Sequence, residues 1–303
     1  MQSNILEDHS LKEFKFPSNI DESTHVFCSH YFSKKKKVKN VIHIIFQHGM
    51  IEHQKRHISL FNALRKEFGA GVIISAMDLV GHGLSGGNRA YVDEFNTYVR
   101  DMYDFVKICH DDIYNDFNVE KTFLISHSLG GLISLKLISD DERELPISID
   151  SLILSNPCIS PKLTLPKTVT SSLELLPVTA GQVRLPLIYD AYDITHDNDS
   201  AIEFMHDHLI SKAITINLGL ETLKAVKPLN SLSYFIKHPC LFLLSGEDKV
   251  VDNKKTELFI TGMDKKKVDV KYYPNMRHDL FNETCRDDVF KNVISFIKKR
   301  RKK

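Results

Sequence analysis

Short apolar runs rich in β-branched residues recur along this chain, and segments with helical patterns separate them. Residues 41–46 and 72–74 are such runs, and so are residues 122–125. Runs of this length and composition are typical of buried strands. Between them, residues 57–68 can form a helix, and residues 95–109 place apolar side chains at three- and four-residue steps. Strands that alternate with helices predict an α/β fold with a mostly parallel central sheet flanked by helices.

The N-terminal region carries a weaker strand signal. Residues 24–32 alternate loosely between apolar and polar side chains, which predicts an edge strand. The lysine run at residues 34–37 follows directly and predicts an exposed hairpin turn.

The alternation of strands and helices stops after residue 156. Five of the ten prolines lie between residues 157 and 186, where the apolar pattern is irregular. Helical periodicity returns around residues 201–223, and further strand-like runs follow. These changes predict a core interrupted by an inserted helical cap. The expected divisions are a first core segment at 1–156, a cap at 157–228 and a second core segment at 229–303.

Composition excludes several classes of protein. The chain has 40 basic and 39 acidic residues, so its bulk charge predicts no nucleic-acid partner. Its five cysteines form no CxxC pair, which argues against a disulfide framework and favours a reducing compartment. No run of about 18 apolar residues is present, and the first 15 residues do not resemble a signal peptide. We therefore expect a cytoplasmic protein.

A serine lies at the junction between a predicted strand and a predicted helix. Residues 126–130 read Ser-His-Ser-Leu-Gly. Ser128 has the placement of a nucleophile on a strand-to-helix turn, although a lone serine in this position is more often a helix cap. Ser126 stands where the usual GxSxG pattern has its first glycine.

Asp248 and His278 complete a candidate catalytic triad with Ser128. Each follows an apolar run that predicts a strand, and the order nucleophile, acid, histidine is improbable by chance. We predict that Ser128 attacks, that His278 is the general base and then the general acid, and that Asp248 fixes the histidine tautomer. Glu247 and Asp252 are rival acids nearby, and Asp252 fits better as the cap of the next helix.

The oxyanion hole is expected from two backbone N–H groups. One belongs to Leu129, the residue after the nucleophile, and the other to Met50, in the loop after an earlier predicted strand. His48 in the same loop fits a buried residue that braces the loop better than a catalytic one.

Two further patterns suggest other chemistry and are set aside. Residues 81–86 match GxGxxG, but no helix is predicted to begin there, so the dinucleotide fingerprint lacks its context. His53 and His57 lie four apart without an HExxH motif or a third ligand. We predict neither a metal nor an organic cofactor.

Several segments together resemble the monoacylglycerol lipase and lysophospholipase branch of the α/β-hydrolases. Residues 48–57 resemble its HGxxEHxxRY segment, with His57 in place of tyrosine, and residues 78–89 resemble its DxxGHGxSxGxR loop. Residues 126–131 are similar to its GHSMGG elbow, with Leu129 in place of methionine. Residues 245–248 and 273–278 align with its acid and histidine loops.

The resemblance implies an α/β-hydrolase fold whose cap lines an acyl channel. It also implies hydrolysis of a single-chain acyl ester: a monoacylglycerol, a lysophospholipid or a small ester, with the first two favoured. Glu52 and Arg56 match positions that organise the polar end of the lipase pocket, although a Glu and an Arg four apart can simply pair with each other. Phe281 stands where the lipases place a second polar histidine, which makes it a third candidate substrate-binding residue and a departure from the pattern.

Other functions stay open at this point. A short-chain esterase, a peptidase or an acyltransferase could use the same triad, and a silent hydrolase fold could bind a ligand without turnover. The basic run at residues 298–303, or the cap, could contact a membrane peripherally, although a solvated terminus is the simpler interpretation of the run. The sequence predicts no oligomeric state.

Overall fold

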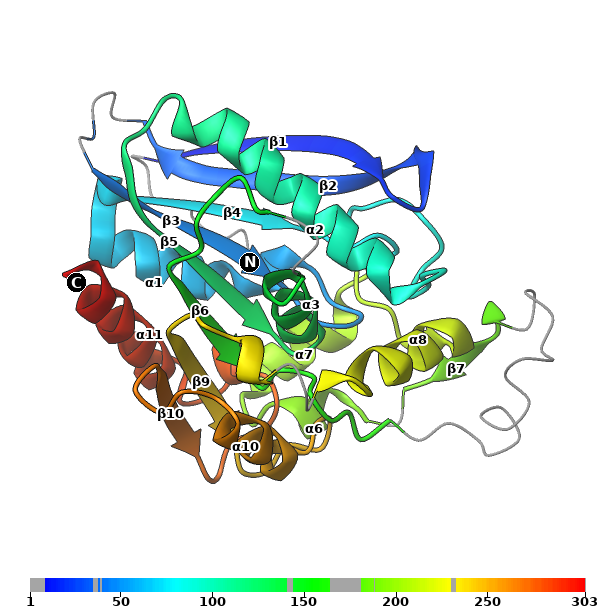
Figure 1. Cartoon of the computed structure of the whole chain (residues 1–303). Coiled ribbons are helices and arrows are strands. Elements are labelled where there is room, and N and C mark those ends of the chain that lie inside the picture. The colour runs from blue at the N-terminus through cyan, green and yellow to red at the C-terminus, as the bar shows by residue number, and fades with distance from the viewer. Residues whose placement is uncertain are drawn as a thin grey trace.

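The computed structural model describes residues 9–34, 38, 40–140, 144–163, 181–187, 189–229 and 233–302. A central eight-stranded sheet runs through it in the order β1-β2-β4-β3-β5-β6-β9-β10 (Figure 1). β1 and β2 are antiparallel to each other, β2 is antiparallel to β4, and the remaining neighbours are parallel. The strands are β1 His9–Ser18, β2 Asp21–Ser33, β3 Val41–Gln47, β4 Val72–Met77, β5 Val119–His127, β6 Ser151–Ser155, β9 Cys240–Ser245 and β10 Val268–Tyr273.

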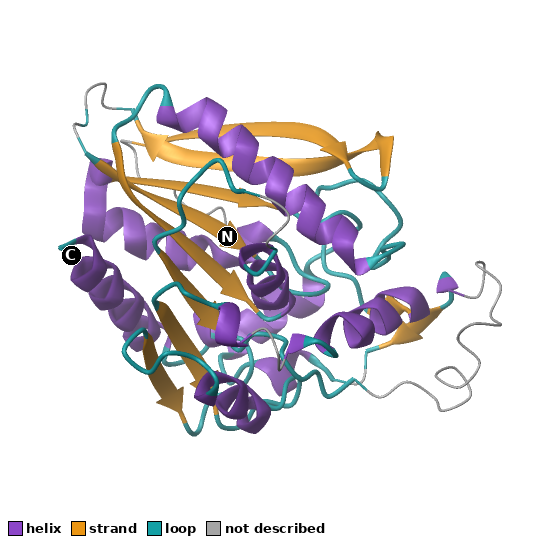
Figure 2. Ribbon diagram, viewed as in Figure 1, coloured by secondary structure: helices purple, strands orange, loops and turns teal. Residues whose placement is uncertain are grey.

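Helices cover both faces of the sheet (Figure 2). The core on one face contains side chains of α2 and α3 together with Phe259 of α10, and the core on the other face contains side chains of α1 and α11. These two layers bury the apolar runs that predicted the strands, which confirms the mostly parallel α/β arrangement. The helices are α1 Ile58–Phe68, α2 Phe95–Cys109, α3 Leu129–Ile138, α10 Asn253–Thr261 and α11 Arg286–Arg301.

The segment between β6 and β9 contributes elements of its own. Strands β7 and β8 form a separate two-stranded antiparallel sheet, and the helices α6, α7 and α8 lie in the described part of the same segment. Residues 164–180 and 188 of the predicted cap lie outside the described residues. The division into core and cap therefore stays a prediction. The elements are β7 Arg184–Pro186, α6 Ala191–Ile194, α7 Asn198–His206, β8 Ala213–Thr215 and α8 Ile216–Val226.

Two predictions for the N-terminal region are wrong. Residues 24–32 lie in β2, which pairs with β1 on one side and β4 on the other, so they do not form an edge strand. β4 lies between β2 and β3, so these two consecutive strands do not form a hairpin. Residues 35–37 of the predicted turn lie outside the described residues. The edge strand is β1. Its lysines and glutamate weaken the alternating apolar pattern of Phe14 and Phe16 that would predict a strand.

Residues 298–301 of the basic C-terminal run belong to α11, and each of them pairs with an acidic side chain. Lys298 pairs with Glu67, Lys299 and Arg300 pair with Asp269, and Arg301 pairs with Glu120. In Figure 1 this end of the chain lies far from β7 and α8, at the opposite end of the molecule. No helix within the described ranges is long and apolar enough to cross a membrane.

Candidate active site

The nucleophile turn is built between β5 and α3. Ser128 has φ 51° and ψ −119°, a conformation that side-chain-bearing residues rarely adopt and that presents its hydroxyl above the sheet edge. A Cβ at Gly130 would lie 2.5 Å from the carbonyl oxygens of Gln47 and His48, so only glycine allows α3 to approach β3 this closely. Ser126, the departure from the usual glycine, fits because its Oγ lies 2.6 Å from the Ser134 Oγ on α3.

The structure brings the three predicted side chains together in one hydrogen-bonded chain. His278 Nε2 lies 2.8 Å from Ser128 Oγ, and His278 Nδ1 lies 2.7 Å from Asp248 Oδ2. The other carboxylate oxygen of Asp248 accepts the backbone N–H groups of Val250 and Val251 at 2.7 and 2.9 Å. Because Asp248 can only accept when it is ionised, Nδ1 carries the proton and Nε2 is free to accept from the Ser128 hydroxyl.

The electrostatics of the pair suit a general base. Burial raises the pKa of Asp248, but the adjacent His278 and the two backbone N–H groups outweigh it and hold that pKa below its ordinary value. Burial lowers the pKa of His278, but the Asp248 carboxylate outweighs it and raises that pKa above 6.5. A basic imidazole is thus held beside the hydroxyl that it would deprotonate.

We expect kcat/KM to rise with pH through the pKa of His278. The imidazole must be neutral to accept the serine proton, and its raised pKa places the midpoint of the rise above 6.5. A pH–rate profile on an uncharged ester measures this midpoint without titration of the substrate. A rate that is flat or falling across neutral pH would contradict the role of His278.

The loop after β3 faces the nucleophile. A Cβ at Gly49 would lie 2.9 Å from the Cβ of Ser128, which shows how closely the loop approaches. Met50 and Leu129 line the same pocket as Ser128, and Leu129 is the first residue of α3, where backbone N–H groups lack a partner within the helix. Their placement is compatible with the predicted oxyanion hole.

Glu52 and Arg56 form a buried charge cluster behind the loop. Glu52 Oε1 accepts from the Gly49 N–H at 2.6 Å and lies 3.1 Å from His57 Nε2. Arg56 lies 3.4 Å from Glu52 and 2.8 Å from Asp279, the residue after the triad histidine. Burial raises the pKa of Glu52, but His57 and Arg56 outweigh it and keep that pKa well below its ordinary value. Glu52 lines the pocket, whereas Arg56 lies behind it.

Phe281 lies away from the pocket surface. It is 1% exposed, and its ring packs against the rings of Phe46, His57 and His127 in the core below the site. Its predicted part in substrate binding would therefore act through the packing of these rings rather than through direct contact.

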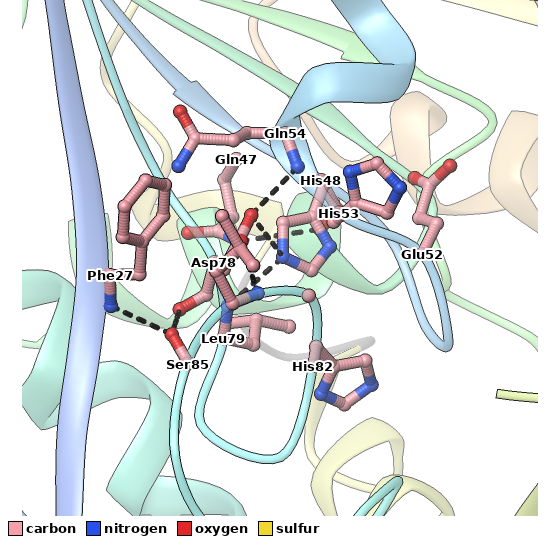
Figure 3. Close-up of polar contacts among 12 residues, drawn as sticks. Phe27, Gln47, His48, Glu52, His53, Gln54, Asp78, Leu79, His82 and Ser85 are labelled. Carbon is pink, nitrogen blue, oxygen red and sulfur yellow. Dashed lines mark hydrogen bonds and ion pairs between the residues drawn. The ribbon is translucent and has the colours of Figure 1, made fainter. Parts of the chain in front are cut away.

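The segment that resembles the DxxGHGxSxGxR loop braces the loop after β3 (Figure 3). Leu79 N–H donates to His48 Nε2 at 2.9 Å, so His48 Nδ1 carries the proton and donates to the Gly49 carbonyl at 2.7 Å. Asp78 Oδ1 accepts from the Gln54 N–H at 2.9 Å. These contacts fix both ends of the loop that holds Met50, in agreement with a bracing role for His48.

A residue that sequence reasoning missed joins the acid loop to the histidine loop. Asn156 follows β6 with φ 40° and is fully buried. Its Nδ2 donates to Ser245 Oγ at 2.7 Å and to the His278 carbonyl at 2.6 Å. Its Oδ1 accepts from the Ser245 N–H and from Asn253 Nδ2, both at 2.9 Å. Asn253 also reaches Asp248 Oδ2 at 3.4 Å.

We expect Asn156→Ala to lower kcat by about tenfold or more, with a smaller effect on KM. The substitution removes the acceptor of the buried Ser245 N–H and one of the donors to the His278 carbonyl, which costs about 1–3 kcal/mol for the unpaired N–H and frees the two loops to shift. Steady-state kinetics and thermal unfolding measure the two effects. Wild-type kcat in a folded variant would show that Asn156 does not position the triad.

The pocket beside Ser128 is predominantly apolar. It is lined by the triad serine and histidine at one end and by side chains from the loop after β3 and from the segment between β6 and β9. His53 Nε2 lies 2.7 Å from Asp207 Oδ2, and Ser211 N–H donates to the Ile51 carbonyl, so these two walls are tied together. Apolar lining residues include Ile51, Leu185, Leu187, Ile194, Phe204 and Ile214.

The described parts of the chain contain no group of three or more His, Cys, Asp or Glu side chains placed to hold a metal ion. His53 is paired with Asp207, and His57 lies beside Glu52.

Comparison with known proteins identifies relatives along almost the whole chain. The family described as "Serine aminopeptidase, S33" matches residues 37–285. Phospholipase YtpA of Bacillus subtilis is 25% identical over 255 residues, which span 84% of this chain and 93% of that protein. The monoglyceride lipase of Mus musculus is 25% identical over 284 residues, which span 92% of this chain and 88% of that protein.

Solved structures share the fold. The monoacylglycerol lipase of Paleococcus ferrophilus superposes with a TM-score of 0.72 at 20% identity and covers 96% of this chain and 99% of its own. A thermostable carboxyl esterase from Bacillus coagulans, solved with glycerol, gives a TM-score of 0.76 at 19% identity with coverage of 96% and 99%.

Proposed function

This chain is a serine hydrolase of the α/β-hydrolase serine aminopeptidase (S33) family, and from that premise we propose that it hydrolyses single-chain acyl esters, with monoacylglycerols or lysophospholipids as substrates. The observation that carries the proposal is the hydrogen-bonded chain Asp248–His278–Ser128 at the end of an apolar pocket. The relatives named monoglyceride lipase and phospholipase support the same substrate class.

The proposed reaction proceeds through an acyl-enzyme. Ser128 Oγ attacks the ester carbonyl while His278 Nε2 takes the hydroxyl proton. The N–H groups of Met50 and Leu129 bind the oxyanion, and His278 then gives the proton to the leaving alcohol. Water, deprotonated by the same imidazole, attacks the acyl carbon, the bond to Ser128 Oγ breaks, and His278 returns the proton to that oxygen as the fatty acid leaves.

The lining of the pocket favours an acyl chain over a polar substrate. Most of its other lining side chains are aliphatic or aromatic, and the burial of each CH₂ group of a substrate against them contributes about 0.8 kcal/mol to binding. Tyr189, Lys162 and Lys249 supply polar groups in the same pocket. A substrate with one acyl chain and a polar head group fits this mixture of apolar and polar lining residues.

An aminopeptidase activity, which the family description suggests, lacks a corresponding feature among the described residues that line the pocket. A substrate α-amino group needs a carboxylate that is free to pair with it. Glu52 and Asp279 are the acidic residues of the pocket lining, and both lie within ion-pair distance of Arg56.

The test is product release by the purified protein from four substrates: a long-chain monoacylglycerol, a lysophosphatidylcholine, a short-chain p-nitrophenyl ester and an aminoacyl anilide. We expect fatty-acid release from one or both lipids at a kcat/KM at least tenfold above that of the short ester. Turnover of only the short ester or only the anilide would overturn the lipid proposal. Transfer to an added alcohol in preference to water would indicate an acyltransferase.

A further inference from the structure

Two short segments expose large apolar side chains near one border of the molecule. Tyr234 and Phe235 belong to the 3₁₀ helix Ser233–Phe235 and are 68% and 54% exposed. Leu258 of α10 is 66% exposed, and α10 lies at the bottom of the view in Figure 1. Exposed apolar side chains that form one patch mark a surface that contacts another molecule, whereas scattered ones do not.

A close contact joins the two segments into one surface. A Cβ at Gly262, the residue at the end of α10, would clash with Ser233 Oγ, so the helix end touches the 3₁₀ helix. Leu258 lies four residues before Gly262 and therefore one turn away on the same side of α10. The exposed side chains of Leu258, Tyr234 and Phe235 are thus neighbours.

Lysines of α10 flank this apolar group on one side. Lys254 and Lys255 are exposed, and they precede Leu258 by four and three residues, so they share its side of the helix. The segment as a whole is basic, because residues 253–267 hold five lysines and two acids.

Lysines near the 3₁₀ helix flank the group on the other side. Lys237 Nζ donates to the Tyr234 carbonyl at 2.9 Å, and Lys267 Nζ donates to the Lys237 carbonyl at 2.8 Å. We call the following set of residues the α10 surface: Tyr234, Phe235, Lys237, Lys254, Lys255 and Leu258. Within the described ranges, the lysines that form ion pairs are others, namely Lys12, Lys55, Lys121, Lys224, Lys249, Lys298 and Lys299.

A second group of exposed apolar side chains has the opposite charge around it. Tyr192 of α6 and Ile202 and Met205 of α7 are exposed as well. Residues 190–203, however, hold five acids and no lysine or arginine. An anionic surface would therefore attract the α10 surface and repel this second group.

We propose that the α10 surface docks the protein on an anionic lipid bilayer. Its aromatic and leucine side chains enter the interfacial layer, where aromatic rings are favoured, while its lysines pair with anionic head groups. Lys249 and Val250 line the pocket and lie directly before α10 in the chain, so docking brings this wall of the pocket toward the bilayer. Docking needs no turnover and thus goes beyond the proposed hydrolysis.

Cosedimentation with lipid vesicles tests the proposal. The full chain carries Ser128→Ala, so that turnover does not alter the lipid. The vesicles are phosphatidylcholine alone or an equal mixture of phosphatidylcholine and phosphatidylserine. We expect partition into the mixed vesicles to be at least about tenfold stronger and to fall as salt is raised, because salt screens the lysines. Equal binding to both kinds of vesicle, or binding to neither, would overturn the proposal.

Two charge reversals in the same background locate the surface. Lys255→Glu is expected to lower partition into the mixed vesicles by at least about tenfold. It should leave α10 folded, because an acid in the first turn of a helix is favourable. Lys15→Glu makes the same change of charge on β1, at the top of the view in Figure 1, and should have little effect. Equal losses from the two would show that net charge, and not the α10 surface, drives binding.

Two apolar substitutions test the inserted side chains in the same way. Phe235→Ser is expected to weaken partition by about tenfold, and Ile202→Ser on α7 to leave it unchanged. Thermal unfolding shows whether each variant keeps its fold, and Lys255→Glu decides if Phe235→Ser does not. The reverse ranking would place the docking surface on α7 and contradict the proposal. Self-association that Phe235→Ser abolishes, found by sedimentation equilibrium in place of vesicle binding, would assign the surface to a second copy instead.

Discussion

Replacement of Ser128 by alanine is expected to lower kcat by a factor on the order of 10⁶ while the fold is retained. The substitution removes the only hydroxyl within hydrogen-bond distance of His278 Nε2 among the described residues, so no acyl-enzyme can form. The positive φ at this position is unfavourable for alanine as well as for serine, so the free energy of unfolding should change little. Fatty-acid release and thermal unfolding, measured on the same preparation, provide the comparison.

Ser126→Ala is the matched control for this prediction. It removes the same atom two residues earlier, where the hydroxyl contacts Ser134 rather than the triad. We expect its kcat to stay within about tenfold of wild type, with a loss of stability of about 1–3 kcal/mol from the buried Ser134 hydroxyl that loses its partner. Equal losses in the two variants would indicate a damaged turn rather than a missing nucleophile.

The second large effect is expected for Asp248→Asn, which should lower kcat by about 10⁴. An amide can turn its NH₂ group toward the imidazole, which then carries its proton on Nε2 and cannot accept from Ser128. The volume of the side chain is unchanged, so KM should change less than kcat. Steady-state kinetics on a monoacylglycerol provide the measurement.

Asp252→Asn separates the triad acid from its nearest rival. Asp252 is the N-cap of α10 and accepts from the Lys254 N–H, and asparagine is an equally good cap. We expect activity close to wild type. A larger loss from Asp252→Asn than from Asp248→Asn would show that the acid has been assigned to the wrong residue.

The sequence predicted the parts of the fold that depend on local pattern. Buried parallel strands appear as apolar runs, and the glycines after Ser128 indicate a close helix–strand contact; both signals lie within a few residues. The sequence did not predict β1, because this strand is the antiparallel edge of the sheet. Its charged side chains face solvent, and only about half of its positions are apolar.

The parts of the site that escaped prediction depend on contacts between distant segments. Asn156 donates a hydrogen bond to the carbonyl of His278, which is 122 residues away in the sequence. Arg56 donates to Asp279, which is 223 residues away. Nothing near Asn156 in the sequence distinguishes it from an ordinary turn asparagine. Phe281 was placed at the pocket by resemblance, but the ring packs into the core because Phe46, His57 and His127 surround it there.

The most direct test of the central claim is to trap the covalent intermediate. Wild-type protein mixed with a long-chain acyl ester and quenched in acid during turnover is digested and examined by mass spectrometry. We predict one acyl group attached to the peptide that contains Ser128, and none in the Ser128→Ala variant. An acyl group on another residue, or steady turnover without any acylated peptide, would contradict the proposed mechanism.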